Sequence, residues 1–287
     1  MTIKTSEATA GELYRILSTA VAPRPICFAS TISAAGQVNL SPYSFFNVVS
    51  INPPILGFSV TRRGSDNSSK DTLNNVLEVP EVVINIVEHS YVEQMSLAST
   101  QYAPGVNEFE KVALTQVPSD GVKPPRVGEA AISFECAVDQ VIALGDGPIA
   151  GNLVLARVTA THLADRVLGA DGKVDSELLD LVGRMGGNHY VRATEEAKFL
   201  VAKPGGPVGI GVDGLPDTVR NNPHLSGNDL GRLGGVKQLP TKEEITTMRE
   251  DPRMQYALMD GEEAVVELAQ KLLSDGEAEA AFRVLLA

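Results

Sequence analysis

The 287-residue sequence is poor in cysteine: it has two, Cys27 and Cys136, and a disulfide framework cannot be built from so few. Each cysteine lies in an apolar run, where cysteine usually behaves as a small hydrophobic residue. We therefore expect two buried free thiols and no Cys-x-x-Cys pair for redox chemistry or metal binding.

Positive charge is also scarce. The chain has 24 Lys and Arg against 36 Asp and Glu, a net charge of −12. Nucleic-acid binding needs clustered cations, so we expect no nucleic-acid partner. No segment approaches the roughly 18 apolar residues of a membrane helix. Residues 1–20 carry four charged side chains where a signal peptide has its apolar core, and we expect a cytoplasmic protein that binds no membrane.

Several catalytic motifs are missing or incomplete. The histidines His89, His162, His189 and His224 show no ligand spacing with a cysteine or carboxylate, so we expect no metal site. The G-x-S-x-G elbow of a serine hydrolase does not occur. Gly209–Gly214 matches G-x-G-x-x-G, but that motif needs a helix directly after it and Leu215-Pro216 follows instead. We interpret this match as a loop.

The sequence does contain a series of short β-branched and aromatic runs bounded by turn residues, which predict strands. These runs are Pro25–Thr31, Val38–Leu40, Ile55–Val60, Val82–Val87, Ala131–Val138, Val141–Leu144 and Leu153–His162. Ser33–Gln37 predicts a hairpin turn in which Gly36 adopts a positive φ. Many short strands with few helices favour a mainly β fold, a β-barrel with helical insertions, over a doubly wound parallel sheet.

Three helices are expected among these strands. The apolar spacing of Ser6–Leu17 predicts a short amphipathic helix. Ser68–Thr72 supplies a cluster of N-cap residues for a helix at Leu73–Leu77. Ser90–Glu93 fits the capping box of another helix.

The composition changes near residue 200, where Lys203–Gly214 holds five glycines and two prolines and regular structure is not expected. Residues 241–287 then carry 5 basic and 11 acidic residues. We therefore predict a barrel domain at 1–200, followed at 201–287 by a Gly/Pro-rich extension and an acidic helical tail.

The acidic tail contains its own helix signals. Thr241–Glu244 fits a capping box, and Glu262–Leu273 and Glu277–Leu286 have amphipathic spacing, with Ser274–Gly276 between them. Two helices of this length are marginal alone in water. We expect them to pack on the barrel or on a partner subunit.

The stretch from Arg24 to Thr72 combines three kinds of chemistry. Hydroxyl groups and backbone around Ser41–Asn47 can hydrogen-bond the edge of a flat heterocycle, and nearby aromatic rings can wall it (Tyr43, Phe45 and Phe46). Three basic residues, Arg62, Arg63 and Lys70, gather before a helix start marked by Thr72, where N–H groups and the helix dipole favour an anion such as phosphate. An ordinary polar loop between two strands explains the same residues equally well.

Five elements resemble, in order and spacing, the flavin-reductase-like family with an FMN-binding split barrel, whose members include flavoredoxin and the reductase component of nitrilotriacetate monooxygenase. They are Arg24-Pro25, Asn39–Asn47, Pro53-Pro54, Lys70–Thr72 and Val83–Ile86. Each element is weak alone, and the combination is specific. The resemblance covers the predicted barrel domain and implies a split barrel that binds FMN.

The resemblance also implies roles for matching positions. Ser41–Asn47 would lie along the isoalloxazine ring, Ser30 and Thr31 near the ribityl chain and phosphate, and Lys70–Thr72 around the phosphate at the helix start. The implied cofactor-binding residues are Ser30, Thr31, Ser41, Pro42, Tyr43, Ser44, Phe46, Asn47, Ser59, Arg62, Lys70, Asp71 and Thr72.

Gly183–Arg192 resembles the closing segment of the family, where a Tyr or His approaches the flavin or the nicotinamide. His189 and Tyr190 are therefore the implied catalytic residues, with simple packing at the barrel end as the alternative. The resemblance implies a homodimer with the flavin near the subunit interface. The chain departs from the family in its long C-terminal extension, which puts the reduction of free flavin in doubt.

The leading hypothesis is an FMN-dependent NAD(P)H oxidoreductase, in which NADH or NADPH reduces FMN and the reduced flavin passes electrons to an acceptor. The acceptor would be a small molecule, a flavin or a partner monooxygenase. Two alternatives stay open: an FMN-carrying electron-transfer module that acts through a protein partner, and a barrel whose flavin site is vestigial.

Overall fold

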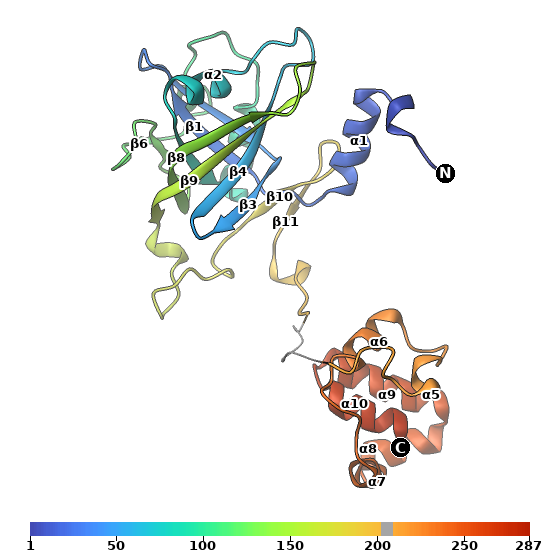
Figure 1. Cartoon of the computed structure of the whole chain (residues 1–287). Helices are drawn as coiled ribbons and strands as arrows, with labels where there is room; N and C mark the ends of the chain where they lie inside the picture. The colour runs from blue at the N-terminus through green and yellow to red at the C-terminus, as the bar shows by residue number, and fades with distance from the viewer. Residues whose placement is uncertain (202–208) are drawn as a thin grey trace. The chain divides into compact units, whose positions relative to one another are not determined.

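The computed structural model describes residues 1–201 and 209–287, which form two compact units, Met1–Lys198 and Phe199–Ala287 (Figure 1). Residues 203–208 of the Gly/Pro-rich segment predicted to be irregular lie outside the described residues. The first unit is built around a large sheet, and the second is built from helices joined by loops.

The first unit contains one antiparallel sheet of seven strands in the order β2-β1-β5-β8-β9-β4-β3. Its strands are β1 (Cys27–Ile32), β2 (Val38–Tyr43), β3 (Phe46–Ile51), β4 (Pro54–Thr61), β5 (Glu81–Ile86), β8 (Ile132–Ala143) and β9 (Gly151–Leu163). Because β2 at one edge also contacts β4 near the other edge, the sheet curls into a barrel. The expected mainly β fold with helical insertions is confirmed.

Alternate side chains of the strands fill the interior of this barrel. Fully buried members of that core include Cys27, Phe58, Ile84, Cys136 and Val154. Both cysteines are free thiols, as expected, and burial raises the pKa of each, that of Cys136 to about 12. At neutral pH they are therefore protonated, apolar core residues.

Short helices and strands complete the first unit. They are 3₁₀ helices at Thr5–Glu7, His89–Tyr91, Asp165–Val167 and Glu195–Ala197, helices α1 (Ala10–Ala20), α2 (Asp71–Glu78), α3 (Val92–Leu97) and α4 (Glu108–Lys111), and strands β6 (Gln116–Val117), β7 (Arg126–Val127), β10 (Val182–Arg184) and β11 (Tyr190–Arg192). Figure 1 shows α2 lying against the sheet beside β1. Met95 of α3 and Phe109 of α4 cover Phe28 and Leu40 in a second apolar cluster. No helix in the described part of the chain has the length and apolar character needed to cross a bilayer.

Several local predictions were wrong. Strand β3 was not predicted, because its exposed Val48, Val49 and Ile51 break the alternation of buried and exposed residues that identifies a half-buried strand. The two strands predicted at 131–138 and 141–144 are one strand, β8, whose ladder continues through an irregularity at Val138/Gln140.

The capping box predicted at Ser90 does not form, and Tyr91 precedes α3 without a side-chain cap. By contrast, Gly36 has the predicted positive φ.

The second unit has its own core. Its helices are α5 (Asp217–Arg220), α6 (Gly227–Leu233), α7 (Lys242–Arg249), α8 (Pro252–Asp260), α9 (Glu262–Ser274) and α10 (Ala278–Leu286). The predicted helices α9 and α10 form, and so does the capping box at Thr241. Their apolar side chains, among them Leu272 and Phe282, pack with residues of the other helices such as Leu233 and Met254.

The expectation that α9 and α10 need the barrel or a partner subunit is therefore wrong. Sequence analysis overlooked α5, α6 and α8, because short helices beside Gly, Pro and Asn residues carry little periodic signal. These helices supply the apolar surface that two isolated helices lack.

A fragment of residues 209–287 should therefore fold alone, with a cooperative thermal transition in far-UV circular dichroism. In that fragment Phe282→Ala should abolish the transition, because deleting a fully buried ring costs about 3–5 kcal/mol, as much as a domain of this size usually has. The control is Tyr256→Ala, which removes an aromatic ring that is 74% exposed. An unfolded wild-type fragment would contradict this assignment.

Candidate functional site

The hydroxyl-rich segment Ser41–Asn47 forms the corner at which β2 ends and β3 begins, next to β4. Phe46 pairs with Phe58 in the β3–β4 register, and the N–H of Ser59 donates to the Phe45 carbonyl across 2.8 Å. The side chains of Ser41, Ser44 and Ser59 are all half-buried. Three partly accessible serines thus lie near this corner, one on β2, one between β2 and β3, and one on β4.

The three aromatic residues of the segment have different environments. Tyr43 is buried with its ring centroid 5.6 Å from that of Phe58, and its hydroxyl has no hydrogen-bond partner in the described part of the chain. Burial raises the pKa of Tyr43 to about 12, so its hydroxyl stays protonated. Phe46 is half-buried, and Phe45 is 39% exposed, 6.4 Å from the ring of Tyr14. Phe45 is the most exposed of the three, and the Arg24 guanidinium lies over its ring, 5.9 Å from the centroid.

The loop that follows β4 carries the basic cluster. Nε of Arg62 donates to the carbonyl oxygen of Asn67 at 2.9 Å and to its Oδ1 at 2.8 Å. Nη1 of Arg63 donates to Oγ of Ser68 at 3.2 Å and also to the Ser69 carbonyl. Lys70 is half-buried, and burial, with a smaller contribution from the charge of Arg63, lowers its pKa. Its Nζ lies 5.5 Å from the centroid of the Tyr43 ring.

Helix α2 begins directly after this loop, and its N-terminus is open. Lys70 is the N-cap residue and no side chain caps the helix, so the predicted N-cap role of Ser68–Thr72 is wrong. The first N–H groups of a helix have no intrahelical acceptor. Here they lie next to the Lys70 side chain and near Arg63, an arrangement suited to an anion.

Two threonines implied as cofactor ligands are instead part of a buried polar network. The Asn39 amide donates to Oγ1 of Thr72 at 2.8 Å and to Oγ1 of Thr31 at 3.3 Å, and the Asn75 amide donates to Thr31 at 3.1 Å. Thr31 and Thr72 have relative exposures of 0% and 1%. Together these bonds fasten α2 to β1 and β2.

The other implied residues are distributed over the same region. Ser30 is fully buried on β1, and its hydroxyl has no partner within residues 1–201 and 209–287. Pro42 and Asp71 are half-buried, and Oδ2 of Asp71 lies 3.9 Å from Nη2 of Arg63. Asn47 is exposed, and its Oδ1 accepts the N–H of Val48 at 2.8 Å.

Arg24, which sequence analysis used only as a family marker, organises the corner. Its guanidinium donates to Oγ of Ser44 at 3.3 Å, to the Val21 carbonyl at 2.8 Å and to the Met185 carbonyl at 3.2 Å, and also bonds the Ser18 carbonyl. The side chain is 6% exposed. Arg24 thereby joins the end of α1, the β2–β3 corner and the β10–β11 hairpin. Nothing in the sequence around Arg24, which precedes a predicted strand, indicates that its side chain joins these three segments.

The implied catalytic residues lie on the β10–β11 hairpin. His189 is exposed, and Tyr190 is 36% exposed with the Arg184 guanidinium 4.6 Å from its ring centroid. The hairpin packs closely on α1: a Cβ placed on Gly186 would lie 2.6 Å from Oγ1 of Thr19. Since backbone bonds also join Arg24 to Arg184, the hairpin is attached to the segment that leads into β1.

A groove of about 630 Å³ separates this hairpin from α3. Its polar lining includes His89, Glu93, Arg184, Tyr190 and Arg192. Sequence analysis missed the contribution of His89 and Glu93, which lie almost a hundred positions before the hairpin. Of the two implied catalytic residues, Tyr190 lines this groove.

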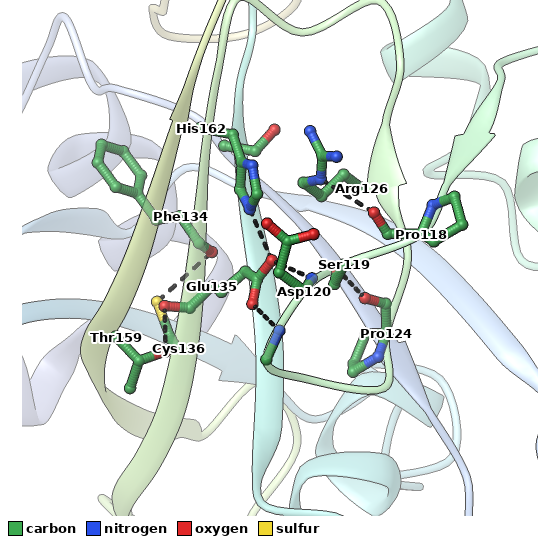
Figure 2. Close-up of polar contacts among 12 residues, drawn as sticks. Pro118, Ser119, Asp120, Pro124, Arg126, Phe134, Glu135, Cys136, Thr159 and His162 are labelled. Atoms are coloured by element: carbon green, nitrogen blue, oxygen red, sulfur yellow. Dashed lines mark hydrogen bonds and ion pairs between the residues drawn. The ribbon is translucent and has the colours of Figure 1, made fainter.

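A second polar cluster lies away from this corner, on β8 and β9 (Figure 2). The fully buried Glu135 carboxylate accepts the N–H groups of Asp120 and Gly121, each at 2.7 Å, and Nε2 of His162 lies 2.6 Å from its Oε1. Figure 2 shows the Asp120 carboxylate directed toward His162 and Glu135. One ligand atom from each of these three residues lies within 4.8 Å of the others.

We expected no metal site because the histidines show no ligand spacing along the sequence. Spacing does not reveal this group, because β8–β9 pairing brings His162 to Glu135, and Asp120 comes from a separate loop. Both oxygens of Glu135 already accept N–H groups. The cluster therefore works as a clamp that holds the Ser119–Gly121 backbone on the sheet.

Comparison with known proteins identifies the first unit. The family model described as the flavin reductase like domain matches residues 19–185. A protein of Aquifex aeolicus is 40% identical over 195 residues, 68% of this chain and 97% of that relative. A protein of Bacillus subtilis, YwrF, is 34% identical over 201 residues, 69% of this chain and 96% of that relative. Because the matches cover 97% and 96% of these two relatives, almost none of their length is left for a counterpart of the second unit.

Solved structures show the same architecture. Nitrilotriacetate monooxygenase component B from Bacillus cereus superposes with a TM-score of 0.65 at 32% identity, covering 70% of this chain and 98% of that one. The 2-nitrobenzoate 2-nitroreductase NbaA of Pseudomonas fluorescens has a TM-score of 0.62 at 28% identity, covering 70% and 96%. A flavin reductase of Shewanella frigidimarina with a split barrel domain shares the fold at 20% identity, with a TM-score of 0.59 over 70% of this chain and 100% of that one.

The Glu135 clamp predicts acid sensitivity. Burial raises the pKa of Glu135, but the N–H groups of Asp120 and Gly121 and the His162 side chain outweigh it and lower the pKa below its usual value. A carboxyl with a depressed pKa stabilises the fold fully above its unfolded pKa of about 4.3, and this contribution is lost as the pH falls through the folded value. Thermal melts should show that Glu135→Gln is destabilised at neutral pH but loses less stability on acidification than the wild type.

The matched control is Glu177→Gln, which changes an exposed carboxylate. It should melt like the wild type throughout. An acid dependence of Glu135→Gln as steep as that of the wild type would show that other carboxylates govern the effect.

Proposed function

The chain belongs to the flavin reductase like family, and we propose that its first unit binds FMN and uses NADH or NADPH to reduce it, with the electrons passed on to an acceptor. The bound flavin would supply the hydride and electron chemistry, and the protein would supply binding, orientation and electrostatics. The observation that carries the FMN assignment is the uncapped N-terminus of α2 beside Arg63 and Lys70.

The phosphate end of FMN fits this helix start. Open N–H groups and the helix dipole favour an anion there, and Lys70 brings a cation whose Nζ is already partly desolvated. Among the described residues the buried Tyr43 hydroxyl has no hydrogen-bond partner, and it keeps its proton, so it remains an available donor; its ring centroid lies 5.5 Å from Nζ of Lys70. Arg63 and Lys70 would hold the phosphate, whereas Thr31 and Thr72 would support the helix from beneath.

The ring end of the flavin fits the β2–β3 corner. The half-buried serines Ser41, Ser44 and Ser59 offer hydrogen bonds to the edge of a heterocycle, and Phe45 offers a partly exposed aromatic side chain. Because Ser44 accepts from Arg24, its own hydrogen is free for another acceptor. His189 and Tyr190, on the hairpin held by Arg24, would border the side from which the nicotinamide approaches.

A partner monooxygenase is the acceptor that one specific observation favours. The B. cereus protein, at 32% identity over nearly its whole length, is named as component B of nitrilotriacetate monooxygenase. An FMN-carrying module that transfers electrons through a protein partner is therefore the second candidate function. Such a module would consume NAD(P)H steadily only when its protein partner is present, whereas the oxidoreductase of the first proposal would do so without that partner.

Flavin titration tests the assignment. The protein should bind FMN about 100-fold or more tightly than riboflavin, because two charge-assisted hydrogen bonds to phosphate contribute about 1.5–3 kcal/mol each. Lys70→Gln should weaken FMN binding about tenfold and leave riboflavin binding unchanged. Quenching of flavin fluorescence measures both affinities.

Anaerobic addition of NADH or NADPH to the FMN-loaded protein should then bleach the flavin absorbance near 450 nm. The control variant is Lys173→Gln, which removes an exposed lysine far from α2 in sequence. Equal affinity for FMN and riboflavin would contradict the phosphate assignment. Flavin that stays oxidised with both NADH and NADPH would contradict the oxidoreductase assignment.

We further propose that the first unit forms a homodimer with the flavin near the subunit boundary. Strand β3 lies at the edge of the sheet, and its Val48, Val49 and Ile51 are 56–79% exposed. Helix α1 likewise exposes Ile16 and Leu17. Exposed apolar surface of this extent is typical of an interface.

The double substitution of Val48→Glu and Ile51→Glu should convert the dimer into a monomer, because paired carboxylates would have to be buried across the interface. Light scattering at micromolar concentration measures the mass. Met259→Glu, at an 84% exposed position in the second unit, should leave the mass unchanged. A wild-type protein with the mass of one subunit would contradict the proposal.

A further inference from the structure

Asn67 occupies the centre of the loop between β4 and α2 in an unusual backbone conformation. Its φ is +58°, in the left-handed region that Asn tolerates better than most residues. Its N–H donates to the Arg63 carbonyl at 3.1 Å, and the Arg63 N–H donates to the Ser68 carbonyl at 2.9 Å. The residue therefore sets the turn that carries the chain from Arg63 to the start of α2.

The side chain of Asn67 connects two partners. Its Nδ2 donates to the main-chain carbonyl of Asp146 at 2.8 Å, in the turn between β8 and β9. Its Oδ1 accepts from Nε of Arg62, whose Nη2 also donates to the Asn67 carbonyl at 2.6 Å. Asn67 thus joins the basic loop to a hairpin that is distant in sequence.

The β8–β9 turn is pressed against this loop at two further points. The Arg62 N–H donates to the Ala150 carbonyl at 2.9 Å. Ile149 has a φ of +59°, which is strained for a β-branched residue, and a Cβ placed on Gly64 would lie 3.2 Å from its Cγ2. The Ala150 N–H donates to the Gly147 carbonyl at 3.1 Å and closes the turn that carries Ile149.

These contacts change the role of Arg62. The bonds from Nε and Nη2 to Asn67 direct the guanidinium into the loop. Arg63 also bonds oxygens of Ser68 and Ser69, but its Nη2 lies 3.9 Å from Oδ2 of Asp71, the first residue of α2. Lys70 is the N-cap residue itself, so these two cations lie at the helix start. Arg62 therefore supports the loop, and its assignment as a phosphate ligand is not retained.

We propose that Asn67 is a positioning residue, which locks the loop of residues 62–70 between Arg62 and the β8–β9 turn and so sets the affinity for the phosphate of FMN. The inference rests on the proposed function. If the cations and the helix start are already ordered, the loop loses no further conformational entropy when the phosphate binds, and the affinity is higher.

The test compares two ligands in three variants of the full chain. Asn67→Gly removes both side-chain bonds while allowing a positive φ, and Asn67→Ala removes the same bonds and adds backbone strain. Both should weaken FMN binding about tenfold and leave riboflavin binding within about twofold, since riboflavin lacks the phosphate. Asp146→Ala is the matched control, because Asn67 bonds the main chain of Asp146, and it should keep the wild-type ratio of the two affinities.

The outcomes are distinct. Equal losses for FMN and riboflavin, or an unchanged FMN affinity, would overturn the positioning role of Asn67. Thermal melts separate stability from positioning: the alanine variant should melt below the glycine variant, yet both should show the same FMN-to-riboflavin ratio. If the wild type itself binds the two ligands equally, the phosphate assignment in the proposed function fails, whatever Asn67 does.

Discussion

The corner that forms the candidate site depends on the buried guanidinium of Arg24. It satisfies carbonyl groups at the end of α1 and on the β10–β11 hairpin, and it bonds Ser44 at the start of the site. These three segments share no continuous sheet, so a cation with several fixed donors is what holds them together. Without it, the buried Ser18 carbonyl would lose its partner, which costs about 1–3 kcal/mol, and the part-buried carbonyls of Val21 and Met185 would lose theirs at a smaller cost.

A second polar network performs the same task for the phosphate end. Asn39 and Asn75 bind the hydroxyl groups of Thr31 and Thr72 inside the protein, and these bonds fix α2 on β1 and β2. The helix start therefore presents its N–H groups from a rigid base. The family resemblance implies Thr31 and Thr72 as cofactor ligands. In the structure they lie beneath α2 and position the helix that would bind the anion.

The elements that could be predicted from the sequence are those with strong local signals. Gly36 in a hairpin turn, the β-branched runs of β1, β4, β5 and β9, and the capping box at Thr241 all follow from chemistry within a few residues. Strand β3 could not be recognised, because its exposed valines suit an interface and not a half-buried strand. The Glu135–His162 clamp was missed for a different reason, since it arises only when β8 and β9 pair.

For the site, the sequence predicts a region but does not distinguish accessible polar side chains from buried ones. Ser44, Thr72 and Arg62 look alike as polar residues in a family pattern. Burial and hydrogen bonding distinguish them: Ser44 is accessible, Thr72 is 1% exposed, and Arg62 is turned toward Asn67. Such distinctions depend on contacts between distant segments, which spacing along the chain does not encode.

Phe45 links the two properties proposed for the first unit. It lies in the hydroxyl-rich corner, beneath the Arg24 guanidinium and beside Tyr14 of α1, and it leads directly into the exposed face of β3. The surface offered to a flavin and the surface offered to a second subunit are therefore continuous along the chain. In the proposed dimer, a flavin at that boundary would contact both subunits and would bind the assembled state more tightly than the separated one. By linkage, flavin binding would then strengthen dimerisation by the same free energy with which dimerisation strengthens flavin binding.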